Sequence, residues 1–223
     1  MTTPEPIVFL FDVDNTLLDN DLAQIEYRAE MARQCGEAAA LRYWDIVQAL
    51  TRELGYTDCL GALQRYRLEA MHDPRLLRMA SFLLDYPFER RLYPDALNVL
   101  THVGQWGSTA LLTDGDVVFQ PRKVERAGLW QAVQGRVLIY IHKEAELDEV
   151  ARRYPARHYV MVDDKLRLLT AIKASWGERV TTVFPKQGHY AADPAVLALY
   201  PPADITIERI GDLLNYGRDS FVG

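Results

Sequence analysis

The sequence predicts an α/β fold in which helices cover a parallel β-sheet. Short apolar runs alternate with helical stretches along most of its 223 residues, and this alternation implies βαβ units with right-handed crossovers. Polar residues follow several of the apolar runs directly. Because ligands bind at the carboxyl ends of parallel strands in such folds, these polar residues are expected to share one site.

The first predicted element is a strand over residues 7–11, whose unbroken apolar character is typical of burial on both faces. Asp12 and Asp14 follow this strand directly. Alternate residues of an extended chain point to the same side, so the two carboxylates are expected to lie close together. Like charges at short range repel unless a cation or a proton lies between them. The pair therefore indicates metal binding, acid–base chemistry or both.

The next region, over residues 21–84, is predicted to be helical. Its apolar residues recur at spacings of three and four, and breaks fall near Gly36, Gly55 and Pro74. Few runs in this region resemble strands. We expect roughly four helices here, inserted after the first strand.

From residue 92 onward the alternation of strands and helices resumes. A turn at Tyr93-Pro94-Asp95 begins a helix that runs to about residue 103. Strands are predicted over residues 109–112, 137–141, 159–162 and 180–184, with a further apolar stretch near Ile205. Helices are predicted over residues 119–127, 144–153, 166–175 and 207–214.

Composition and charge narrow the classes of protein. The net charge of -6 argues against a nucleic-acid partner, which would normally require a basic patch. Cys35 and Cys59 fit neither a zinc motif nor a disulfide framework. The first residues lack the pattern of a signal peptide, and no apolar run approaches the ~20 residues that span a bilayer. We expect a cytoplasmic protein with no membrane partner; the oligomeric state stays open.

Four polar motifs resemble those of the haloacid dehalogenase-like hydrolase superfamily, in the same order. They are Asp12-Val13-Asp14-Asn15-Thr16, Thr113 with Asp114 after an apolar run, Lys143, and the acidic pair Asp163-Asp164. The resemblance spans about residues 7–184. It implies a Rossmann-like core over residues 1–18 and 91–223 and an inserted all-helical cap over residues 19–90. Hinges are then expected near Asp19-Asn20 and Glu89-Arg90.

The resemblance also implies roles for these residues in phosphoryl transfer. Asp12 takes the position of the nucleophile, and Asp14 that of the general acid and base. The Thr113 hydroxyl, the backbone N–H groups near Asp114 and the Lys143 ammonium would bind the phosphoryl oxygens. Mg²⁺ would be held by the Asp12 carboxylate, the Asp14 carbonyl and Asp164, with Asp163 binding through water or orienting the site.

Two positions depart from the usual pattern of the family. Glu144 stands after Lys143, where proline is common, and Leu168 stands where a further aspartate often follows the acidic pair. Lys123 is an alternative for the lysine motif, but its place in the middle of a predicted helix is more typical of a solvated side chain. Because Leu168 replaces that further aspartate, metal binding is expected to rely on the adjacent pair Asp163 and Asp164.

Asp14 narrows the expected reaction. Dehalogenases of the family lack an acid two residues after the nucleophile, because a halide leaves without a proton, and its phosphonate hydrolases differ there too. We therefore expect a Mg²⁺-dependent phosphatase that hydrolyses a small phosphorylated metabolite through an aspartyl-phosphate. Two alternatives stay open: a phosphomutase of the same superfamily, and a non-catalytic protein that binds a phosphorylated ligand.

Overall fold

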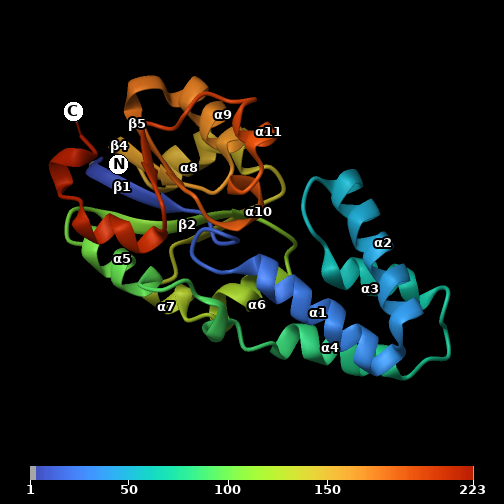
Figure 1. Ribbon diagram of the computed structural model, residues 1–223. Helices are drawn as coiled ribbons and strands as arrows, with labels where there is room; N and C mark the ends of the chain where they lie inside the picture. Colours follow the sequence, from blue (N-terminus) through green and yellow to red (C-terminus); the bar gives the residue numbers. More distant parts are fainter. Residues whose placement is uncertain (1–3, 223) are drawn as a thin grey trace.

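The computed structural model describes residues 4–222 and contains a six-stranded parallel sheet in the order β3-β2-β1-β4-β5-β6 (Figure 1). This confirms the predicted α/β fold. The strands are β1 (Glu5–Phe11), β2 (Ser108–Asp114), β3 (Val137–Tyr140), β4 (Ala156–Val162), β5 (Val180–Pro185) and β6 (Ile205–Ile207). In the sheet register Phe11 pairs with Val162 of β4 and with Leu111 of β2. The residues that follow β1, β2 and β4 therefore meet at one edge.

Helices cover both faces of the sheet. On one side lie α5 (Ala96–Val103), α6 (Phe119–Arg126) and α7 (Leu129–Ala132), and on the other lie α8 (Leu147–Arg153) and α9 (Leu166–Trp176) (Figure 1). Strand β1 is buried between the two layers, as its apolar run predicts. Ile7, Phe9 and Phe11 join the core on the α5 side, and Val8 and Leu10 join the core on the α9 side.

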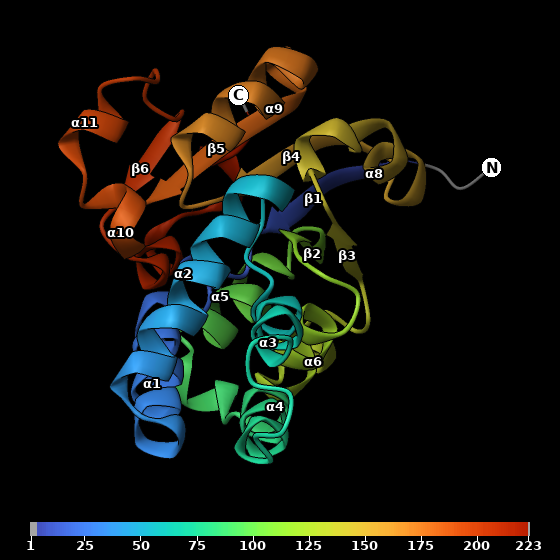
Figure 2. The same ribbon diagram turned by 90° about the vertical axis from the view of Figure 1, so that its right-hand side faces the viewer.

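The segment between β1 and β2 forms a helical insert that extends beyond the sheet (Figures 1 and 2). It consists of α1 (Asn20–Cys35), α2 (Glu37–Leu54), α3 (Cys59–Arg67) and α4 (Arg75–Asp85), followed by the 3₁₀ helix η1 (Phe88–Arg91). Local capping sets its boundaries: the Asp19 side chain accepts from the backbone N–H of Leu22 at 2.9 Å. Gly55 ends α2 in the left-handed conformation.

The chain enters and leaves the insert along two paired segments. Leu18 and Leu92 form an antiparallel bridge. The Asp19 N–H donates to the Arg91 carbonyl at 2.7 Å, and the Tyr93 N–H donates to the Leu17 carbonyl at 2.9 Å. Both segments adjoin the expected hinges, so the insert is connected to the core through one narrow, hydrogen-bonded ribbon.

Several short elements differ from their prediction. The predicted helix over 144–153 is divided into the 3₁₀ helix η2 (Lys143–Ala145) and α8. The predicted helix over 207–214 is instead the end of β6 and the 3₁₀ helix η4 (Ile210–Asn215), with a further turn at η5 (Arg218–Ser220). The short helices α7, α10 (Gly188–Ala191) and α11 (Pro194–Leu197) and the turn η3 (Gly177–Arg179) were not predicted. Segments of three or four residues are too short to show a helical period.

Within residues 4–222, no helix combines the length and the apolar composition that crossing a membrane requires.

Replacement of Leu10 by alanine tests the predicted burial of β1. Leu10 is fully buried in the sheet, and removal of its side chain should lower the free energy of unfolding by about 2–5 kcal/mol. The measurement is urea unfolding followed by circular dichroism. Leu41→Ala on the exposed face of α2 is the matched control and should change the stability by less than about 0.5 kcal/mol. Equal losses in the two variants would contradict this packing.

Candidate active site

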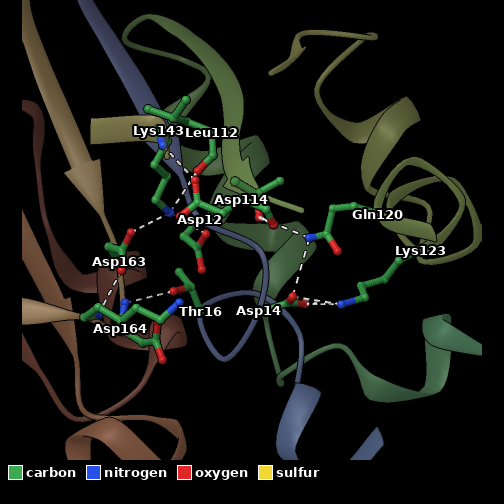
Figure 3. A network of polar contacts seen from close by, with 12 residues as sticks. Asp12, Asp14, Thr16, Leu112, Asp114, Gln120, Lys123, Lys143, Asp163 and Asp164 are labelled. Carbon is green, nitrogen blue, oxygen red and sulfur yellow. Dashed lines mark hydrogen bonds and ion pairs between the residues drawn. The ribbon is translucent and has the colours of Figure 1, made fainter. Parts of the chain in front are cut away.

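Three carboxylates meet at the edge of the sheet where β1 and β4 end. Asp12 follows β1, and Asp163 and Asp164 follow β4; all three are buried, and each offers an oxygen within 4.8 Å of the others (Figure 3). Backbone pairing fixes this convergence. The Asp12 N–H donates to the Val162 carbonyl at 2.9 Å, and the Asp163 N–H donates to the Val183 carbonyl at 3.1 Å. The parallel register thus extends into the loop that carries the acids.

Lys143 lies inside this acidic group and is only 1% exposed. Its Nζ lies 2.5 Å from Asp12 Oδ1 and 2.6 Å from Asp163 Oδ2, and it donates to the Leu112 carbonyl at 3.2 Å. Burial alone would lower the pKa of Lys143, but Asp12 and Asp163 raise it above the ordinary value. The lysine is therefore a permanent cation whose position depends on these carboxylates.

The pKa values of the two acids after β4, Asp163 and Asp164, are raised in this cluster. Burial raises the pKa of Asp163 to about 6, against the opposing effect of Lys143. Burial also raises the pKa of Asp164, and the charges of Asp163 and Asp12 act in the same direction. One ammonium among three buried carboxylates leaves an excess of negative charge that a cation or protons must balance.

The oxygens of this cluster fit a divalent metal ion. Oδ2 of Asp12 and both carboxylate oxygens of Asp164 are buried and have no hydrogen-bond partner among residues 4–222. Buried carboxylate oxygens are normally hydrogen-bonded, so such a concentration of unpartnered acceptors requires an explanation. Mg²⁺ prefers oxygen ligands of this type and binds one or two carboxylates while keeping several waters. Asp12 and Asp164 are thus the side chains that could hold it.

Two threonines complete the walls of the cluster. The Thr16 hydroxyl accepts from the Asp164 N–H at 3.1 Å, which joins the loop after β1 to the loop after β4. Thr113 is buried at the end of β2, where its hydroxyl accepts from Gln120 at 3.1 Å. The carboxylate of the neighbouring Asp114 accepts from the Lys143 backbone N–H at 2.8 Å. Asp114 therefore supports the loop that presents the lysine.

Asp14 lies apart from the buried acidic group and faces α6. Both of its carboxylate oxygens lie close to Lys123 Nζ, at 2.7 and 2.8 Å, and Gln120 donates to one of them at 3.5 Å (Figure 3). The Lys123 ammonium also donates to the Asn20 side chain at the start of α1, at 3.1 Å. The side chain of Asp14 is 25% exposed. Its carboxylate is thus fixed in orientation yet open to a ligand.

The expectation that Lys123 is solvated is wrong, because this side chain is 4% exposed and ion-paired. A position in a predicted helix does not tell whether the side chain faces the core or the solvent. In the structure, the face of α6 that carries Lys123 lies against the loop after β1. Gln120 and Lys123 are one turn apart on α6 and both contact the site. The sequence did contain a signal for this arrangement: a glutamine and a lysine three residues apart, in the helix that follows the Thr113 loop.

The C-terminal half of the chain also holds the loop after β1, which the sequence did not reveal. Gln187 donates to the Thr16 carbonyl at 3.0 Å and to the Asn15 carbonyl at 3.3 Å. The His189 backbone N–H donates to the Asp21 carboxylate at 2.8 Å. This segment after β5 therefore binds the loop that carries both Asp12 and Asp14, and also the first turn of α1.

A cavity of about 100 Å³ opens between the insert and the core beside Asp14. Asp14 and Lys123 line it from the core, and Gly55, Tyr56 and Thr57 of the α2–α3 loop line it from the insert. Gly55 allows close contact, because a Cβ atom there would overlap the ring of His142. The loop between α2 and α3 thus closes over the edge of the sheet that carries the acids.

Replacement of Asp164 by asparagine should stabilise the metal-free protein. The raised pKa values mean that the folded state binds more protons than the unfolded state between pH 3.8 and about pH 6. The stability without metal therefore falls as pH rises through this window. Asp164→Asn should raise the free energy of unfolding at pH 7 in EDTA by about 1–3 kcal/mol and flatten this decline.

Urea unfolding in EDTA from pH 4 to pH 8 measures both effects. Asp45→Asn, on the exposed face of α2, is the control and should leave the curve unchanged. A less stable Asp164→Asn variant at pH 7 would show that the cluster is not under electrostatic strain.

Solved structures resemble this chain over nearly its full length. A haloacid dehalogenase-like hydrolase from Burkholderia xenovorans LB400 is 62% identical, covers 97% of this chain and 99% of its own, and has a TM-score of 0.93. A magnesium-bound HAD-hydrolase from Bacillus subtilis (15% identity, 95% and 98% coverage, TM-score 0.62) and an L-2-haloacid dehalogenase from Xanthobacter autotrophicus (19% identity, 93% and 96% coverage, TM-score 0.58) share the fold. No family model and no curated protein matches the sequence. The identity and coverage of the Burkholderia structure show that this chain belongs to the haloacid dehalogenase-like hydrolase family.

Proposed function

We propose that this hydrolase is a Mg²⁺-dependent phosphatase that cleaves a small phosphomonoester through an aspartyl-phosphate intermediate. The observation that carries the proposal is the placement of Asp14. Its carboxylate lines the cavity beside the acidic cluster but takes no part in the cluster. An oriented carboxyl at this position suits a group that gives a proton to a departing alkoxide and later takes one from water.

The same carboxyl distinguishes ester hydrolysis from dehalogenation. The haloacid dehalogenase in the comparison shares the fold of this chain. Its sequence identity is too low to indicate a shared reaction. A halide is stable as an anion and needs no proton on leaving, so Asp14 would have no task in that reaction. Lys123, Gln120 and the cavity wall all serve to position Asp14, which supports a reaction whose leaving group is an oxygen.

In the proposed first step an Asp12 carboxylate oxygen attacks phosphorus and the bond from phosphorus to the ester oxygen breaks. The Asp14 carboxyl gives its proton to that oxygen, and the alcohol leaves. In the second step Asp14 takes a proton from water as the water oxygen attacks phosphorus. Phosphate departs with the electron pair returning to Asp12, and both aspartates recover their first states. Division into two steps through a covalent intermediate lowers each barrier.

The surrounding groups supply charge stabilisation. The Lys143 ammonium touches Asp12 and lies where negative charge accumulates on the phosphoryl oxygens. Mg²⁺, held by Asp12 and Asp164 and by the Asp14 carbonyl, would neutralise further charge when bound. The Thr113 hydroxyl and the neighbouring backbone N–H groups are proposed to bind the phosphoryl oxygens. The HAD-hydrolase from Bacillus subtilis, which shares this fold, is bound to magnesium, and this supports the choice of metal.

The helical insert is proposed to act as a cap on this site. Its α2–α3 loop closes one side of the cavity, and the paired linkers at Leu18 and Leu92 provide a hinge. Closure would exclude water before the covalent intermediate forms. The small size of the cavity favours a small metabolite as the substrate. We propose that the protein acts in the cytoplasm.

Hydrolysis of an aryl phosphate tests the proposed function directly. The wild-type protein should release phosphate with Mg²⁺ and lose this activity in EDTA, because the metal neutralises charge on the phosphoryl group. Asp12→Asn should lower kcat by about 10³-fold or more, since it removes the nucleophile. Phosphate release is measured by a colorimetric assay.

Two controls accompany this assay. Asp45→Asn should keep full activity, and an unchanged melting temperature of Asp12→Asn would exclude unfolding as the cause of its loss. Release of halide from a 2-haloacid, without phosphate release from any ester, would overturn the proposal.

The role of Asp14 predicts a dependence on the leaving group. Asp14→Asn should lower kcat by about 10²–10⁴-fold for an alkyl phosphate, whose alkoxide requires a proton. For an aryl phosphate with an acidic phenol, the loss in the first step should be less than about 10-fold. Single-turnover kinetics with both substrates separate this step from hydrolysis of the intermediate. Equal losses for the two esters would assign Asp14 to positioning alone.

A further inference from the structure

Lys165 is a cation beside the active site that the proposed chemistry does not use. It follows Asp164 directly and begins helix α9, where its backbone N–H donates to Asp163 at 2.8 Å. Its ammonium has no carboxylate within 4.0 Å and no hydrogen-bond acceptor among residues 4–222. The nearest described aromatic contact is Tyr190, whose ring centre lies 5.4 Å from Lys165 Nζ. The charge is therefore available to a ligand.

Two cavities meet at this lysine. Lys165 and Tyr190 line both the cavity beside Asp14 and a second cavity of about 270 Å³. Asp164 also lines the second cavity, which therefore borders the acidic cluster. The rest of its wall is largely apolar and includes Phe184 and Leu197. Such a wall suits the carbon skeleton of a leaving group, and the ammonium suits an anion attached to it.

The other cations around these two cavities are already paired. Lys123 holds Asp14 at 2.7 Å, and Arg167 holds Glu144 at 2.9 Å. His189 lies 2.8 Å from a carboxylate oxygen of Asp21. Lys165 differs from them because its ammonium forms no ion pair within residues 4–222, although its side chain is partly buried. An unpaired charge in such a place is costly unless a ligand or a charged partner compensates it.

Three carboxylates also line these cavities and oppose an anion there: Asp14 in the first, Asp164 in the second and Asp114 in both. One oxygen of Asp114 accepts from the Lys143 backbone N–H, and burial raises the pKa of Asp114. An incoming anion would therefore bind at the Lys165 ammonium, the cation that lines both cavities and forms no ion pair within residues 4–222.

We infer that Lys165 binds a second anionic group of the substrate, so that the substrate is a phosphomonoester whose alcohol carries a carboxylate or another phosphoryl group. The inference rests on the proposed phosphatase function, because it takes the phosphoryl group at Asp12 as the first anchor. The second cavity then receives the skeleton of the alcohol. Specificity arises from a charged hydrogen bond at the far end of the molecule.

Binding of phosphonates in the presence of Mg²⁺ tests this role without turnover. Methylphosphonate carries one anionic group, phosphonoacetate adds a carboxylate, and ethylenediphosphonate adds a second phosphoryl group. Titration calorimetry should show that at least one of the two larger ligands binds the wild-type protein about 10- to 100-fold more tightly than methylphosphonate. The ligand that gains most identifies which anion the substrate carries.

Lys165→Met should remove this difference and leave the affinity for methylphosphonate within about two-fold. Lys165→Arg should restore part of it, because the guanidinium keeps the charge. Lys186→Met is the control, since Lys186 is paired with Glu208 and lines neither cavity. Equal weakening of all three phosphonates in Lys165→Met would show that the lysine only balances the acidic cluster, and would overturn the inference. Absence of any preference in the wild-type protein would overturn it too.

The outcome is separable from that of the proposed function. A wild-type protein that hydrolyses an aryl phosphate without a second anionic group, but shows no preference between the phosphonates, fails this inference alone. A protein that hydrolyses no phosphate ester fails the proposed function, whatever its affinity for the phosphonates.

Discussion

The contact between the Lys143 ammonium and the carboxylates of Asp12 and Asp163 is the interaction on which the site depends. Three acids at the end of two adjacent strands would repel one another in a buried space, and desolvation would add to the cost. Lys143 offsets part of this cost from a neighbouring loop after β3. The Asp114 side chain and the Leu112 carbonyl hold that loop and its lysine. The cluster is thus assembled from the loops after β1, β3 and β4, which meet through the ion pairs of Lys143.

The two acids of the first motif have different electrostatic surroundings although only one residue separates them. Asp12 is buried with other carboxylates and a lysine, in a cluster whose oxygens could hold a metal ion. Asp14 is partly exposed, ion-paired with Lys123, and in contact with the cavity. The backbone turn after β1 separates them, and Gln187 fixes that turn from behind. Such separate surroundings suit the proposed division of roles, in which Asp12 attacks phosphorus and Asp14 transfers protons.

Most of the sheet and the motif positions could be predicted from the sequence, because periodicity and strand-end chemistry are local properties. The strands β1 to β5 lie where their apolar runs indicate, and Asp12, Lys143, Asp163 and Asp164 converge as parallel topology requires. Lys123 shows what local patterns omit. Its burial depends on which face α6 turns toward the loop after β1, a tertiary property. The same holds for the hydrogen bonds of Gln187 to the loop after β1 and for the cavity at Lys165, because each involves segments that lie far apart in the chain.

The adjacent entry and exit of the helical insert have a consequence for how this protein family can diversify. Because Leu18 and Leu92 are bridged, the chain returns to the sheet at nearly the point where it left. The two ends of the insert thus lie side by side, as the two ends of a turn do, and the insert does not separate β1 from β2 in the sheet. Helices at the far end of the insert can therefore vary, whereas the first turn of α1 contacts Lys123 and the His189 segment through Asn20 and Asp21. Such changes would alter the side of the cavity that the α2–α3 loop lines and leave Asp12, Asp163 and Asp164 at the ends of β1 and β4.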